Sequence, residues 1–117
     1  MTVSEFYARI RGDCADAMAR LTKEERILKY VGRFVSGAGL GELDRALQEQ
    51  RWADAFREAH SLKGVALNLG FRVLADSSGA LCEALRSGEA PGDVSALYDA
   101  VARDYADTVA AAKELLG

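Results

Sequence analysis

Apolar residues recur at intervals of three and four along almost the whole chain, whereas the alternation typical of β-strands is hard to find. Proline, which interrupts helices, occurs only once, at Pro91. The pattern predicts an all-α protein. Because four substantial amphipathic helices are joined by short connections, we expect an antiparallel four-helix bundle with one or two short extra N-terminal helices.

The first of these short helices is predicted from Val3, Phe6 and Ile10, which share one stripe before a break at Gly12 and Asp13. A second short helix is expected to follow, running through Met18 and Leu21.

A firmer helix start is predicted at Thr22, whose side chain can cap the helix while Glu25, three residues later, completes a capping box. The stretch SGAGLG, from Ser36 to Gly41, should interrupt this helix as a kink or a short loop. The apolar face before the interruption comprises Ile27, Leu28, Val31, Phe34 and Val35, and the face after it Leu40, Leu43 and Leu47.

Two further helix boundaries follow from glycines. The helix from Trp52 to Leu69 should end at Gly70, in the position of a left-handed cap, and Gly88 should close the helix after it. The stripe of that next helix comprises Phe71, Leu74, Ala75, Ser78, Leu81, Cys82 and Leu85. The stripe of the last helix comprises Val94, Leu97, Val101, Tyr105, Val109, Ala112 and Leu116.

Length and composition limit the expected domain organisation, partners and location of the protein. A chain of 117 residues without linkers or repeats is expected to form a single domain, residues 1–117. With 15 basic against 18 acidic side chains, the net charge of -3 argues against nucleic acid as a partner. No apolar run approaches membrane-spanning length and the N-terminus does not resemble a signal peptide, so we expect no membrane association and a cytoplasmic location.

The histidine and cysteine content bears on metal binding. Two scattered cysteines, Cys14 and Cys82, and one histidine, His60, cannot by themselves assemble a usual zinc site. No metal site and no cofactor are therefore expected, and a monomer is the simplest oligomeric state.

His60 is predicted to face away from the bundle core. With about 100° of rotation per residue, the apolar residues of its helix fall in an arc opposite the histidine. This predicted core arc comprises Ala55, Ala59, Leu62, Val65, Ala66 and Leu69.

Small and apolar residues share the outward stripe with His60, where charged side chains would be usual. The stripe contains Ala53, Phe56, Gly64 and Leu67, with Arg57 and Lys63 at its edges. Exposed apolar residues of this kind indicate a docking surface, although Phe56 and Leu67 could instead pack beneath the N-terminal helix or a loop.

The residue types around His60 suit phosphoryl transfer. An exposed neutral imidazole is a competent nucleophile and can accept a phosphoryl group. Lys63, one turn away, can offset charge on the phosphoryl oxygens, but it could also be an ordinary solvated lysine. Gly64 costs about 1 kcal/mol relative to alanine inside a helix, and its missing side chain would let a partner's active site approach the imidazole.

The segment AHSLKGVALNLG resembles the HxLKGxxxxxG signature of the histidine-containing phosphotransfer family, met here by His60, Leu62, Lys63, Gly64 and Gly70. The tryptophan-containing stretch QRWADAFREAH and the start of the next helix, at Phe71 and Leu74, are similar to the same family. Val65 and the SGAGLG break depart from the family pattern.

The resemblance implies a carrier in a multistep phosphorelay rather than an enzyme. His60 would take a phosphoryl group from the aspartate of one receiver domain and pass it to another, with Lys63 assisting, Gly64 giving access and Gly70 shaping the helix end. The implied partners are response-regulator receiver domains and a hybrid sensor histidine kinase, and the receiver would supply Mg²⁺ and the acidic residues.

Two other readings remain open at the level of sequence. A helical adaptor could bind receiver or kinase domains without transferring phosphate, although an inactive relative would be expected to lose the His60, Lys63 and Gly64 set. The phosphoacceptor module of a chemotaxis-type histidine kinase has a similar motif, but ATP-binding glycine motifs are absent from this chain.

Overall fold

The computed structural model describes residues 1–117 and contains seven α-helices and no strands. The molecule is elongated, with extents of 42 × 24 × 19 Å. Its helices are α1 (Val3–Arg9), α2 (Cys14–Leu21), α3 (Glu24–Ser36), α4 (Gly41–Gln48), α5 (Trp52–Asn68), α6 (Arg72–Leu85) and α7 (Val94–Leu116). The prediction of an all-α fold is confirmed.

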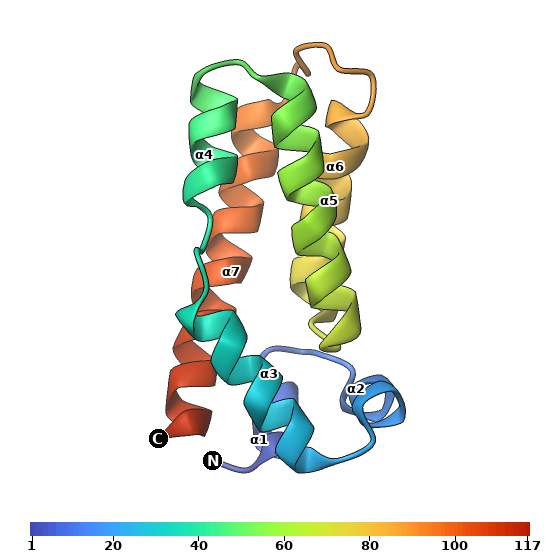
Figure 1. The fold of residues 1–117 in the computed structure, drawn as a ribbon, viewed down its shortest axis with the longest axis vertical. Helices are drawn as coiled ribbons and strands as arrows, with labels where there is room; N and C mark the ends of the chain where they lie inside the picture. Colours follow the sequence, from blue (N-terminus) through green and yellow to red (C-terminus); the bar gives the residue numbers. More distant parts are fainter.

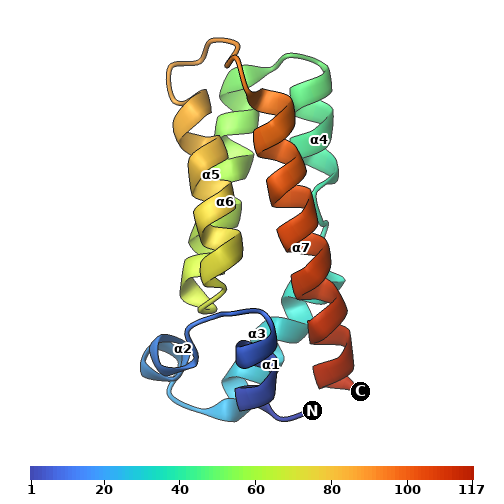
Figure 2. The same cartoon turned by 180° about the vertical axis from the view of Figure 1, so that it is seen from behind.

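Helices α4, α5, α6 and α7 form a bundle along the long axis of the molecule, and α1, α2 and α3 gather at one end (Figure 1). The view from behind shows α7 running the full length of the molecule, so that its last turns lie beside the N-terminal helices (Figure 2). The two short N-terminal helices predicted from the sequence correspond to α1 and α2.

The core is continuous along the bundle. All seven residues of the predicted α6 stripe are buried, from Phe71 to Leu85. At the N-terminal end, Phe6 packs edge-on against Tyr7 and Phe71, and Phe34 packs edge-on against Phe71. Phe71 therefore joins the bundle to the N-terminal helices.

The SGAGLG interruption is a loop, as expected. Helix α3 ends at Ser36, α4 begins at Gly41, and Gly39 has a φ of 70°. In Figure 1, α3 lies obliquely across the end of the bundle instead of continuing the line of α4.

The predicted capping box at Thr22 is wrong. Thr22 ends α2 with a φ of 68°, and the N-cap of α3 is Lys23, which makes no side-chain capping bond. The turn between α2 and α3 uses Thr22 for its left-handed conformation, so the residue is not in the extended geometry that N-capping needs. A complete capping box occurs instead at the start of α1, where Thr2 and Glu5 bond reciprocally.

Three apolar residues assigned to inward-facing stripes are exposed. Leu28 is 37% exposed because α3 crosses the bundle end obliquely, so that only Ile27 and Val31 on that helix are fully buried. Leu116 is 42% exposed in the final turn of α7. Val65 is 44% exposed, because the loop between α3 and α4 leaves a groove beside α5 where a continuous helix would have covered it.

Candidate functional site

Helix α5 carries the HSLKG segment, and the structure separates its two faces. Ala55, Ala59 and Ala66 are fully buried against the bundle, whereas His60 is exposed. The small alanines let α5 pack closely against α6 and α4. The outward direction predicted for His60 from helical rotation is therefore the direction it has in the structure.

The imidazole of His60 is held between two side chains. Its ring stacks on Phe56, one turn earlier in α5, with centroids 6.0 Å apart and an interplanar angle of 18°. Its Nδ1 lies 4.0 Å from the Sγ of Cys82 on α6, within the range of a weak sulfur hydrogen bond. Since Nδ1 faces Cys82, the other ring nitrogen, Nε2, is the one left for chemistry.

Cys82 keeps its proton in this environment. The residue is 2% exposed, and burial raises the pKa of its thiol, an effect that the nearby cations Arg86 and Lys63 only partly offset. A neutral thiol can accept a weak hydrogen bond from Nδ1–H of the imidazole. The sequence pattern correctly placed Cys82 in the core, but gave no signal that it also contacts His60.

Phe56, which the sequence places on the outward stripe with His60, is half-buried, so only part of its side chain is accessible to a partner. It packs against the core cluster, and the guanidinium of Arg86 lies over its ring, 5.5 Å from the centroid. Arg86 also pairs with Glu83, and this side-chain hydrogen bond lowers the pKa of the Glu83 carboxyl. Arg86 was missed from the sequence because it comes from the C-terminal cap of α6, a contact that no periodicity on α5 reveals.

Lys63 and Gly64 lie one turn beyond His60. Lys63 is half-buried and its aliphatic stem lies against Gly79 of α6. Gly64 is exposed, and a Cβ atom added there would have no heavy atom within 4 Å. The space beside the histidine is therefore open.

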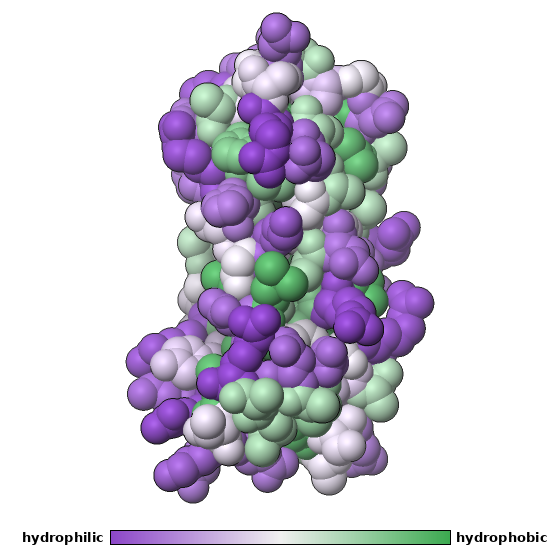
Figure 3. Space-filling model, turned by 90° about the vertical axis from the view of Figure 1, so that its right-hand side faces the viewer, coloured by the Kyte–Doolittle hydropathy of each residue, from purple (hydrophilic) through white to green (hydrophobic).

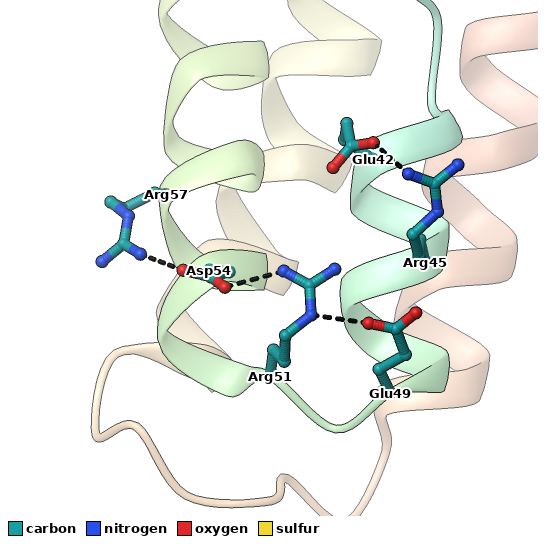
Figure 4. Close-up of polar contacts among 6 residues, drawn as sticks. All are labelled: Glu42, Arg45, Glu49, Arg51, Asp54 and Arg57. Carbon is teal, nitrogen blue, oxygen red and sulfur yellow. Dashed lines mark hydrogen bonds and ion pairs between the residues drawn. The ribbon is translucent and has the colours of Figure 1, made fainter.

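Leu67 and Arg57 are both exposed, as expected of a docking surface. Arg57 pairs with Asp54, whose other oxygen accepts a 2.7 Å bond from Arg51, and Arg51 in turn donates to Glu49 (Figure 4). The hydrogen bond from Arg51 holds the pKa of the Asp54 carboxyl below its usual value. This chain of ion pairs fastens the α4–α5 turn to the start of α5.

Gly70 is the one residue of the signature that is buried. Its φ is 73°, and an added Cβ would lie 2.6 Å from the carbonyl oxygen of Asp13 and 3.1 Å from the Cβ of Ala17. The carbonyl of Gly70 accepts a 2.8 Å hydrogen bond from Asp13 N–H, and the hydroxyl of Tyr7 donates at 2.6 Å to the carbonyl of Leu69. The predicted left-handed cap is confirmed, and it is also the contact point for α1 and α2.

One hollow in the surface lies away from His60. It is a groove of about 790 Å³ on the other side of α5, lined by Tyr30, Arg33, Val65 and the loop residues 37–40 among others.

No group of three or more histidine, cysteine, aspartate or glutamate side chains is arranged to hold a metal ion. No helix combines the length and apolar character needed to cross a membrane.

The face on which α5 and α6 meet is mixed in character. Hydrophobic side chains reach the surface in small groups between hydrophilic ones (Figure 3). His60 contacts Phe56 on this face, and Arg86 covers the Phe56 ring. Arg57 and Lys63 on α5 add further positive charge, and Leu67 adds an exposed apolar side chain.

A family model described as the Hpt domain matches residues 36–114, which include the whole of α4, α5 and α6 and most of α7. No curated protein matches the chain. No solved structure matches it either. Helices α1 and α2 and all but the last residue of α3 lie outside the matched segment.

Proposed function

Because the chain belongs to the Hpt domain family, whose members are phosphotransfer carriers in two-component signalling, we propose that His60 is its phosphoryl-accepting residue. The observation that carries the proposal is the placement of the chain's one histidine: exposed, beside the open Gly64, and backed by Cys82. An exposed imidazole with one nitrogen engaged offers the other as the nucleophile.

The proposed step is an in-line displacement. The electron pair of His60 Nε2 forms the N–P bond while the P–O bond to a receiver's aspartate breaks, and the bonding electrons leave on the aspartate carboxylate. Transfer onward to a second receiver is the reverse reaction with another aspartate. Such transfers depend on positioning and on stabilising charge at the phosphoryl oxygens, which Lys63 supports.

The surrounding residues have proposed roles in docking and access. Gly64 leaves room for the receiver's active site to close over the imidazole, and Leu67, Arg57 and the edge of Phe56 contact the receiver. Gly70 shapes the end of α5. The receiver brings Mg²⁺ and the acidic residues that bind it, so this chain needs only to present His60.

The proposed setting is a phosphorelay fed by a hybrid sensor histidine kinase. We propose that residues 1–117 act as one domain, that the protein works as a cytoplasmic monomer, and that its partners are receiver domains. The net charge of -3 supports a protein partner over nucleic acid.

A transfer assay tests the proposal directly. The protein is incubated with receiver domains that have been phosphorylated by acetyl phosphate in the presence of Mg²⁺. Wild type should acquire a phosphate that is labile in acid and stable in alkali, and His60→Gln should acquire none. If wild type binds several phosphorylated receivers and yet remains unlabelled, the protein is an adaptor and the carrier proposal is wrong.

A second assay addresses the open space at Gly64. Gly64→Gln should slow transfer at least tenfold, because its side chain projects into the region where the receiver must approach, while the circular dichroism spectrum stays that of wild type. Gly32→Gln is the matched control, since Gly32 is also a glycine inside a helix with no heavy atom within 4 Å of its Cβ position, but it lies on α3, outside the docking surface. Equal transfer rates for Gly64→Gln and wild type would contradict the access role.

A further inference from the structure

Lys63 differs from the other lysines of the chain in its environment. Lys23, Lys29 and Lys113 are exposed, whereas Lys63 is half-buried. Its stem crosses from α5 to α6 and runs along the surface of α6. A lysine stem lying on an apolar surface has fewer accessible rotamers, so its ammonium group occupies a narrower region.

The surface along which the stem runs is provided by Gly79. An added Cβ at this position would lie 3.5 Å from both Cδ and Cε of Lys63 and 3.9 Å from its Nζ. Gly79 stands in the interior of α6, where glycine costs about 1 kcal/mol relative to alanine. Its backbone is not left-handed, so local conformation does not require glycine there.

We propose that Gly79 is a positioning residue: the absence of a long side chain on α6 lets the Lys63 stem lie flat and holds its ammonium group on the His60 side of the α5–α6 seam. The importance of that ammonium in transfer rests on the proposed function, but the packing of Lys63 on Gly79 does not. The phosphoacceptor site would then draw on both helices, with Cys82 orienting His60 and Gly79 making room for Lys63.

Two observations support this placement. The positive charge of Lys63 partly offsets the rise that burial causes in the pKa of Cys82 and adds to the lowering of the pKa of Glu83, so its ammonium lies near these two neighbours on α6. Close approach of the two helix backbones would be the ordinary reason for a glycine on α6. However, the three atoms nearest to the added Cβ all belong to the Lys63 side chain and none to the α5 backbone.

The first test measures how accessible the Lys63 amine is to a chemical reagent, and it does not involve phosphoryl transfer. Lysines are acetylated with limiting N-hydroxysuccinimidyl acetate and the modification rate of each is followed by mass spectrometry. Lys63 should react more slowly than Lys29 in wild type, and Gly79→Leu should raise the Lys63 rate to about that of Lys29. Gly32→Leu is the matched control, because Gly32 is also interior to a helix and has no neighbour within 4 Å of its Cβ position.

The second test measures transfer from a phosphorylated receiver that labels the wild type. Gly79→Leu should slow transfer about tenfold, equivalent to about 1.4 kcal/mol of barrier, and should have no further effect in a Lys63→Ala background. Gly79→Ala should slow transfer less than threefold, because a methyl group 3.5 Å from the Lys63 stem makes an ordinary van der Waals contact. Gly32→Leu should transfer at the wild-type rate.

The outcomes separate the two proposals. An unchanged Lys63 acetylation rate in Gly79→Leu overturns the inference. The inference is also overturned if the double variant Gly79→Leu/Lys63→Ala transfers more slowly than Lys63→Ala alone, because Gly79 would then act independently of Lys63. If no receiver labels the wild type but Gly79→Leu still exposes Lys63, the proposed carrier function fails while the packing of Lys63 on Gly79 stands.

Discussion

The two glycines of the signature, Gly64 and Gly70, have opposite surroundings. Gly64 has no heavy atom within 4 Å of its Cβ position, whereas the same position on Gly70 would lie 2.6 Å from the Asp13 carbonyl. One glycine leaves space for a partner outside the molecule, and the other lets the molecule's own N-terminal helices approach. Residue type alone therefore does not tell whether a glycine serves binding or packing, and substitutions can separate the two.

The largest effect should come from Gly70→Ala. The new methyl group would meet the Asp13 carbonyl in a residue that also has a φ of 73°, and we expect the free energy of unfolding to fall by roughly 3 kcal/mol. Urea denaturation measures it. Gly88→Ala is the matched control, since Gly88 has a φ of 78° but no neighbour within 4 Å, and it should lose only about 1 kcal/mol. Equal losses would mean that the contact with Asp13 costs nothing.

The next effect concerns the hydroxyl that fastens α1 to the end of α5. Tyr7→Phe removes the buried 2.6 Å hydrogen bond to the Leu69 carbonyl, so the free energy of unfolding should fall by about 1.5 kcal/mol in urea denaturation. Tyr30→Phe, at an exposed tyrosine, should change it by less than about 0.5 kcal/mol. A loss no larger in Tyr7→Phe than in Tyr30→Phe would show that water replaces the lost hydroxyl.

Gly64→Ala should act in the other direction. With open space around the new methyl group and a gain in helix propensity, the free energy of unfolding should rise by about 1 kcal/mol, visible as a higher urea midpoint. A loss of stability would mean that Gly64 serves packing after all, and the contrast with Gly70 would disappear.

The smallest effect on stability should come from Arg72→Ala, on the surface near Gly70. Arg72 and Asp13 form a 3.4 Å pair in which the Arg72 side chain is 67% exposed, so Arg72→Ala should cost less than about 0.5 kcal/mol in the same denaturation measurement. Asp13→Ala should cost about 1 kcal/mol, because its carboxylate also caps α2 by accepting from Asp16 N–H. If Arg72→Ala and Asp13→Ala lowered the free energy of unfolding equally, Asp13 would stabilise the protein only through its ion pair and not by capping α2.

Sequence periodicity predicted the parts of the fold that depend on one helix at a time. The seven-residue stripe of α6 is buried throughout, and His60 has the outward direction that 100° per residue gives it. The loop at SGAGLG and the left-handed Gly70 also follow from local preferences that the residues carry with them.

What periodicity missed depends on neighbouring helices. Val65 was assigned to the core because its own helix places it there, but exposure depends on whether another helix covers it, and the α3–α4 loop does not. The capping box at Thr22 has the right residues, but the turn after α2 puts Thr22 in a different conformation. The contacts of His60 with Cys82 and of Lys63 with Gly79 join α5 to α6, which no single-helix pattern contains.

The hydrogen bond from Tyr7 to Leu69 joins residues 62 positions apart in the chain. Closing so long a loop costs more conformational entropy than closing the short connection between α5 and α6. We therefore expect the α5–α6 hairpin to form early in folding, and α1 and α2 to dock late, once the left-handed turn at Gly70 is in place. In native-state hydrogen exchange the amides of α1 and α2 should open before those of α6, so the helices that dock last would also be the first to undock.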